Sequence, residues 1–77
     1  MYDKEKIKQI GIYCRNFRID VFGLSLNDFC NKCGENVKNV SAFEHGKANN
    51  IKYVLYYLNE CNEHELDTFS RGLYRIL

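Results

Sequence analysis

The 77-residue sequence predicts an all-α protein, a single compact domain of five helices over residues 1–77. The chain has no proline and only five glycines, a composition that favours helices over strands and tight turns. Apolar residues recur at intervals of three and four, the spacing that places them on one face of a helix. Residues that commonly cap helix N-termini stand directly before several of these stretches.

The first helix is expected over residues 3–21. Asp3 can cap its N-terminus. A continuous apolar stripe then steps by three and four residues through Ile7, Ile10, Cys14, Phe17 and Val21. Residues 22–24 are expected to form the turn that follows.

Two short helices joined by a tight turn are expected over residues 25–46. Ser25 and Asn36 are good N-caps for them. Gly34 can adopt the left-handed conformation that ends the first, and Gly46 ends the second. Because so few residues separate the two helices, they are expected to cross steeply and the second to project.

The fourth and fifth helices are expected at about residues 51–59 and over residues 63–76. In the fourth, the predicted inward residues are Ile51, Val54, Leu55 and Leu58, with Tyr53, Tyr56 and Tyr57 on the other faces. The fifth has acidic residues near its start and two arginines near its end, which suits the helix dipole. Its predicted apolar stripe is Leu66, Phe69, Leu73 and Ile76.

Residues 25–46 resemble the helix-turn-helix of the lambda-repressor/Cro-like DNA-binding proteins, which include the XRE-type regulators. The residues that carry the resemblance are Phe29, Cys30, Cys33, Gly34, Val40, Phe43, Glu44 and Gly46. It extends over about residues 7 to 59 and implies a five-helix lambda-repressor-like domain, with the second and third helices as the helix-turn-helix. The chain departs from the family at Leu26, where Gln is usual, and in a turn that is one residue longer.

The resemblance also implies a structural ion pair between Arg18 and Glu44. A partly buried ion pair is expensive to break on one side only, by ~3–5 kcal/mol. We therefore expect either single substitution to destabilise the fold more than it alters recognition.

The expected function of the third helix is insertion into the DNA major groove. With Val40 and Phe43 in the core, its outward face carries polar and small residues. By resemblance, Val37, Lys38 and Ala42 read bases, and Asn36 contacts phosphate. The full set of expected DNA-binding residues is Asn36, Val37, Lys38, Asn39, Ser41, Ala42, Lys47 and Asn49. The alternative is that the polar residues are simply the solvated face of a helix.

The charge distribution agrees weakly with DNA binding. The net charge is only +1, with a balance of +3 in residues 1–59 and −2 in residues 60–77. No apolar run approaches the ~20 residues of a membrane span, and the N-terminal residues lack an apolar signal core. A cytoplasmic protein without membrane association is therefore expected.

The last two helices, at about residues 50–77, carry more apolar side chains than one small monomer is expected to bury. We interpret the excess apolar surface of these two helices as a homodimer interface. Its expected residues are Tyr56, Tyr57, Phe69, Leu73, Tyr74 and Ile76. Packing of these side chains inside one monomer is the alternative.

Cys30 and Cys33 form a CxxC pair, and Cys14, Cys61, His45 and His64 offer further metal ligands. Both thiols of the pair, however, occupy core positions of a helix, where buried free cysteine is common. We therefore expect no metal, cofactor or small-molecule ligand. No catalytic constellation is present in the sequence, so an enzyme is not expected.

The sequence thus predicts a sequence-specific double-stranded DNA-binding transcriptional regulator. A phage or mobile-element type repressor, acting as a homodimer on a palindromic operator, fits best. The alternative is a helix-turn-helix scaffold that binds protein, as an antirepressor or inhibitor. Salt dependence separates the two, because phosphate-dominated binding weakens steeply as salt rises.

Overall fold

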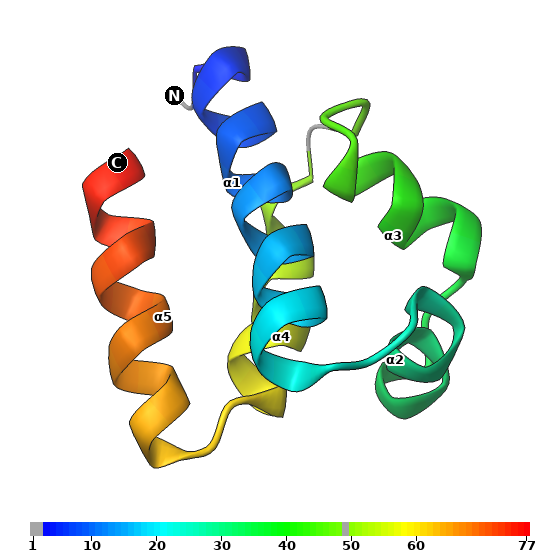
Figure 1. The fold of residues 1–77 in the computed structure, drawn as a ribbon. Helices are drawn as coiled ribbons and strands as arrows, with labels where there is room; N and C mark the ends of the chain where they lie inside the picture. The colour runs from blue at the N-terminus through cyan, green and yellow to red at the C-terminus, as the bar shows by residue number, and fades with distance from the viewer. Residues whose placement is uncertain (1–2, 49) are drawn as a thin grey trace.

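Helix α1 (Lys4–Phe17) contacts α3, α4 and α5 and forms the centre of the fold (Figure 1). The computed structural model describes residues 3–48 and 50–77, which are helical or irregular and contain no strand. The further elements are the π-helix η1 (Arg18–Phe22), α2 (Leu26–Cys33), α3 (Val37–Glu44), the 3₁₀ helix η2 (Ile51–Tyr53), α4 (Val54–Glu60) and α5 (Glu63–Ile76). In Figure 1, α3 and α5 lie on opposite sides of α1.

Helix α1 begins where the sequence predicts. The Asp3 side chain accepts a hydrogen bond of 2.9 Å from the Glu5 backbone amide. The side chains that this helix buries are Ile7, Ile10, Cys14 and Phe17. The first four residues of the predicted stripe are therefore confirmed.

The end of this helix differs from the prediction. After Phe17 the chain forms the wider π-helix η1, which ends at Gly23 in the left-handed conformation, with φ 64°. The altered rotation leaves Val21 41% exposed and turns Phe22 towards the core instead. The Phe22 ring centroid lies 5.3 Å from that of Phe17, so the expected inward position of Val21 is wrong.

Helices α2 and α3 have the caps that the sequence predicts. Ser25 Oγ accepts from the Asp28 amide at 3.1 Å, and the Asn36 side chain accepts from the Lys38 amide at 2.8 Å. Gly34 has φ 71°, and its amide donates to the Cys30 carbonyl at 2.8 Å. These local bonds satisfy backbone groups that the short helices would otherwise leave unpaired.

The fourth helix faces the core with other residues than expected. It starts as the 3₁₀ helix η2, and Tyr53 and Tyr57 are buried while Leu55 is 59% exposed. Because residues 53–58 are all apolar, their pattern cannot specify which face is buried. The predicted inward position of Leu55 and the predicted outward positions of Tyr53 and Tyr57 are wrong.

Helix α5 has the predicted bounds and a capping box. The Asn62 side chain accepts from the Glu65 amide at 2.8 Å, and the Glu65 carboxylate accepts from the Asn62 amide at 3.0 Å. Phe69 is fully buried, but Leu66 is 41% exposed, so its place on the buried stripe is corrected.

Aromatic side chains join the helices in the core. Phe17 and Phe69 make an edge contact with ring centroids 4.9 Å apart, which ties α1 to α5. Phe29 and Tyr57 lie 4.6 Å apart and tie α2 to α4. Every helix within residues 3–48 and 50–77 is too short or too polar to span a lipid bilayer.

Candidate nucleic-acid interface

A buried ion pair fixes α3 against the rest of the domain. Arg18 Nε and Nη2 donate to the two carboxylate oxygens of Glu44, each at 2.9 Å. Arg18 Nη1 also donates to the Leu24 carbonyl at 2.8 Å. The Arg18–Glu44 pair that the resemblance implies is thus present, and it connects the end of α3 to η1 and the following turn.

Tyr57 completes this cluster. Its hydroxyl donates to Glu44 Oε2 at 2.6 Å, and the side chain is fully buried. Burial and the hydrogen bond to Glu44 raise the pKa of Tyr57, and the hydrogen bond to Glu44 raises the pKa of Arg18. Tyr57 therefore helps to hold α3 in place from α4, a role that the sequence analysis missed.

The N-terminus of α3 is held by a second polar group, Glu35. One carboxylate oxygen accepts from the Asn36 amide at 2.8 Å, and the other accepts from the Tyr56 hydroxyl at 2.9 Å. Asn39 Nδ2 lies 3.5 Å from the first oxygen. The Asn36 backbone hydrogen bond, followed by that from Tyr56, lowers the pKa of Glu35. The carboxylate is thus engaged beside the cap.

The outward face of α3 contains a surface hollow of about 250 Å³. Its lining residues are Lys38, Ser41, Ala42, His45 and Lys47. Four of the eight predicted DNA-binding residues are therefore brought together here. The hollow carries two lysines and no carboxylate, so it is suited to an anionic partner.

The other predicted DNA-binding residues have separate positions. Asn36 is the α3 cap, Val37 is 38% exposed in the first turn, and Asn39 is the neighbour of Glu35. Asn49 lies outside the described residues.

His45 also lines the hollow but is absent from the predicted DNA-binding set. Its place three residues after Ala42, and seven after Lys38, is the helical spacing that identifies a shared face.

Lys8 also approaches this region from α1. Its side-chain carbons pass so close to Gly46 that a Cβ atom there would collide with them. Gly46 has φ 74°, a conformation that L side chains rarely adopt. A third lysine thus lies at the end of the candidate interface, and no sequence pattern indicated it.

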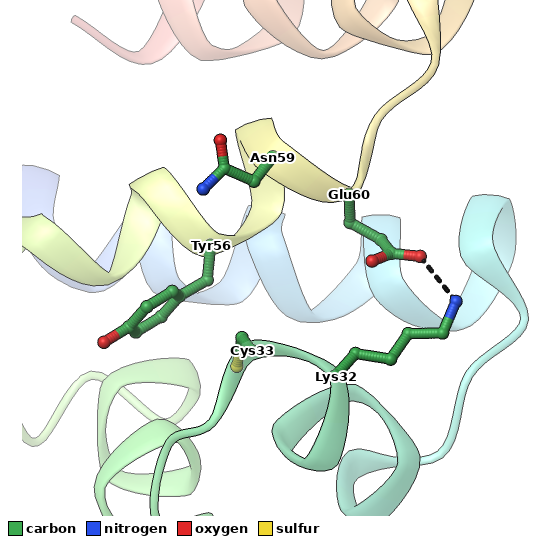
Figure 2. Close-up of a pocket in the computed structure, with 5 residues that line it drawn as sticks. All are labelled: Lys32, Cys33, Tyr56, Asn59 and Glu60. Atoms are coloured by element: carbon green, nitrogen blue, oxygen red, sulfur yellow. Dashed lines mark hydrogen bonds and ion pairs between the residues drawn. The ribbon is translucent and has the colours of Figure 1, made fainter.

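A second hollow, of about 320 Å³, lies between α2 and α4 (Figure 2). Its lining residues are Lys32, Cys33, Tyr56, Asn59 and Glu60. Lys32 Nζ forms an ion pair with Glu60 Oε2 at 3.0 Å across one end. Burial raises the pKa of the Cys33 thiol, which opposes a reactive or metal-binding thiolate.

The cysteines are free, and the described residues hold no group of three or more His, Cys, Asp or Glu able to bind a metal. Burial raises the pKa of Cys14, Cys30 and Cys61 as well. All four thiols are therefore held in their protonated form, as expected of packing residues.

The expected dimer interface requires correction. Tyr57 and Phe69 are fully buried in the monomer core, so neither is available to a second copy. Leu73 and Ile76 pack partly against the same core, and Tyr56 lies at the second hollow. Tyr74 alone of the six is strongly exposed, at 80%. Tyr57 and Phe69 therefore belong to the monomer core, whereas the other four residues keep accessible surface.

Searches of protein-family models, curated proteins and solved structures found no match to this chain.

Proposed function

We propose that this chain is a sequence-specific double-stranded DNA-binding regulator of transcription. In this proposal α2 and α3 act as a helix-turn-helix, and the outward face of α3 enters the major groove. The resemblance to lambda-repressor/Cro-like proteins motivates the proposal. The observation that carries it is the hollow on α3, which brings Lys38 and Lys47 together with small and polar side chains and no carboxylate.

The chemistry of this face suits DNA. Lys38 is exposed and donates to guanine O6 or N7, the acceptors that distinguish guanine in the major groove. Ala42 is a small apolar partner for a thymine methyl group. Lys47 is exposed just after α3 and contacts the phosphate backbone, which gives affinity and orientation.

The rigid base of α3 supports the same function. Base reading requires side chains held on a fixed element, because a loosely held helix loses its register with the groove. Three groups hold α3: the Arg18–Glu44 ion pair, the Tyr57 hydroxyl and the Glu35 contacts at its cap. The first two are buried, so solvent screens them little.

A homodimer belongs to this proposal, because a two-fold protein reads a palindromic operator. Leu55, Leu66 and Leu77 are exposed on or directly after α4 and α5, at 59%, 41% and 58%. Leu77 also lines an apolar hollow of about 190 Å³ with Ile10, Ile51, Val54 and Leu73. We name this set of exposed leucines the α4–α5 leucines and propose that a second copy covers them. Repression by blocking polymerase is the simplest mechanism.

A protein-binding scaffold is the second candidate. The exposed Val37 at the start of α3 favours it, because an apolar side chain there suits a protein surface as well as a thymine methyl. In that case the α3 face would bind an acidic partner protein, as an antirepressor or inhibitor does.

The test is a selection from random duplex DNA at about 150 mM salt, a concentration at which phosphate contacts are already weakened. Wild type is run beside Lys38→Ala and the control Lys32→Ala, which removes the same charge from the second hollow. We expect an enriched inverted repeat that Lys38→Ala loses or relaxes and Lys32→Ala retains. No enrichment by folded wild-type protein would overturn the proposal and favour the scaffold.

A further inference from the structure

His45 stands directly after α3, and one of its ring nitrogens is already occupied. Nδ1 lies 2.8 Å from the Ser41 carbonyl oxygen and 3.5 Å from Ser41 Oγ. A carbonyl oxygen only accepts, so Nδ1 must carry the proton in this contact. Nε2 has no partner among the described residues and is left to interact with whatever occupies the hollow.

Because Nδ1 keeps its proton in the contact with Ser41, the two protonation states of the ring differ only at Nε2. In the neutral ring Nε2 is an acceptor, whereas in the imidazolium it carries a proton and donates. A phosphate oxygen accepts hydrogen bonds only, so it repels the first state and binds the second. Histidine changes between these states within about pH 5 to 8 in ordinary surroundings.

The charged groups around His45 favour an anionic ligand in the hollow. Lys38 and Lys47 line the same hollow, and Lys8 approaches the adjoining Gly46 from α1. The carboxylate of the preceding residue, Glu44, is buried and paired with Arg18. A phosphate bound in the hollow would place a negative charge beside the ring and favour the imidazolium.

We propose that His45 contacts a DNA backbone phosphate as an imidazolium, so that DNA binding is coupled to the uptake of one proton. The inference rests on the proposed function and adds a residue and a pH dependence to that interface. On binding, the neutral ring gains one solvent proton at Nε2 and donates it to a non-bridging phosphate oxygen. The Nε2–H bond forms as a hydronium ion or buffer acid gives up its proton; the phosphate oxygen only accepts the resulting hydrogen bond, and no bond between heavy atoms changes.

The test uses a mixed-sequence duplex of about 30 base pairs, because phosphate contacts do not require a specific operator. Affinity is measured from about pH 5.5 to about pH 8.5 for wild type, His45→Gln and His64→Gln. His64 is the other histidine, exposed on α5 outside the hollow. We expect wild type and His64→Gln to bind about tenfold more weakly at the upper pH, and His45→Gln to bind equally at both.

A second readout is the salt dependence. Losing one phosphate contact reduces the slope of log affinity against log salt by about 0.9. Wild type should show this reduction between the two pH values, and His45→Gln should have the smaller slope throughout. Calorimetry in buffers of different ionisation enthalpy counts the proton taken up, and it applies to wild type even if His45→Gln folds poorly.

The outcomes separate this inference from the function on which it rests. Duplex binding without proton uptake, or with an equal pH dependence in His45→Gln, overturns the role of His45 and leaves the DNA-binding proposal intact. Folded wild-type protein that binds no duplex at low salt overturns both.

Discussion

Gly11 on α1 lies directly against the backbone of Phe43 on α3. A Cβ atom at position 11 would overlap the Phe43 carbonyl oxygen, and Gly11 is buried in this contact. Glycine inside a helix is destabilising by roughly 1 kcal/mol relative to alanine. Here the contact gives a reason for it, since only glycine allows α1 and α3 to approach this closely.

We expect Gly11→Ala to lower the free energy of unfolding by about 1–3 kcal/mol, because the added methyl group meets backbone that cannot move aside. Urea denaturation measures the change. The control is Gly72→Ala on α5, where the added methyl group meets the side chain of Tyr13. That side chain would have to give up its hydrogen bond of 3.0 Å to the Phe69 carbonyl, but unlike backbone it can move, and alanine favours the helix, so a smaller loss is expected. Equal losses in the two variants would contradict this account of Gly11.

The buried ion pair predicts an asymmetric response to substitution. Replacing Arg18 with Met, or Glu44 with Leu, should destabilise the protein by ~3–5 kcal/mol, because the remaining partner is buried without its counterpart. The combined change Arg18→Met with Glu44→Leu should be milder than either single change. Chemical denaturation of the three variants tests this, and additive losses would argue against a direct pairing.

Alkaline pH should destabilise the fold. Burial raises the pKa of Cys14 above its ordinary value of 9.0. Below pH 9.0 the Cys14 thiol is protonated in both the folded and the unfolded protein. Above this pH the unfolded chain loses the proton while the folded protein still holds it. Stability is therefore full below about pH 9 and falls by about 1.4 kcal/mol per pH unit above it, for this group. The free energy of unfolding, measured between about pH 8 and 10, should fall less steeply with pH in Cys14→Ala than in wild type. An unchanged slope would exclude Cys14 as the source of the pH dependence.

Lys38 and Lys47 should affect DNA binding differently. Lys38→Ala should relax preference at one base position by ~1–3 kcal/mol, because a base contact is lost. Lys47→Ala should weaken all sequences alike and reduce the salt slope by about 0.9, because a phosphate contact is lost. Binding titrations on the selected operator and on single-base variants measure both. Lys32→Ala, which changes the second hollow, should resemble wild type. Identical profiles for Lys38→Ala and Lys47→Ala would refute the assignment.

The α4–α5 leucines should govern the oligomeric state. Leu66→Glu should convert a dimer to a monomer, because a carboxylate in an apolar interface has no counterpart. Its control is Ile12→Glu on α1, a residue with the same exposure of 41%. Sedimentation measures the mass of each variant. A wild-type monomer at high concentration, or loss of the dimer in Ile12→Glu as well, would rule out this interface.

Local signals in the sequence were sufficient to place several of the helix ends. Ser25, Asn36 and Asn62 cap helices in the structure, and Gly34 ends α2 with a positive φ. The predicted range 63–76 matches α5. Caps and glycine stops act within a few residues, so their outcome depends little on the rest of the fold.

The candidate site was predictable in part. The expected outward face of α3 includes Lys38, Ser41 and Ala42, which do line one hollow. Lys8 was beyond prediction, because it reaches this hollow's edge only through the close approach of α1 to Gly46.

By itself the sequence determined an all-helical chain, the caps of α1, α2, α3 and α5, the bounds of α5 and most of the α1 core stripe. Tertiary structure decided which faces are buried in the last two helices. Tyr57 faces Glu44 and the core, while Leu55 in the same apolar run faces solvent. The physical reason is that residues 53–58 are apolar on every side, so periodicity gives no direction. The direction comes from neighbours distant in sequence, here a buried carboxylate that needs a hydroxyl donor and a phenylalanine on α2 that needs a packing partner.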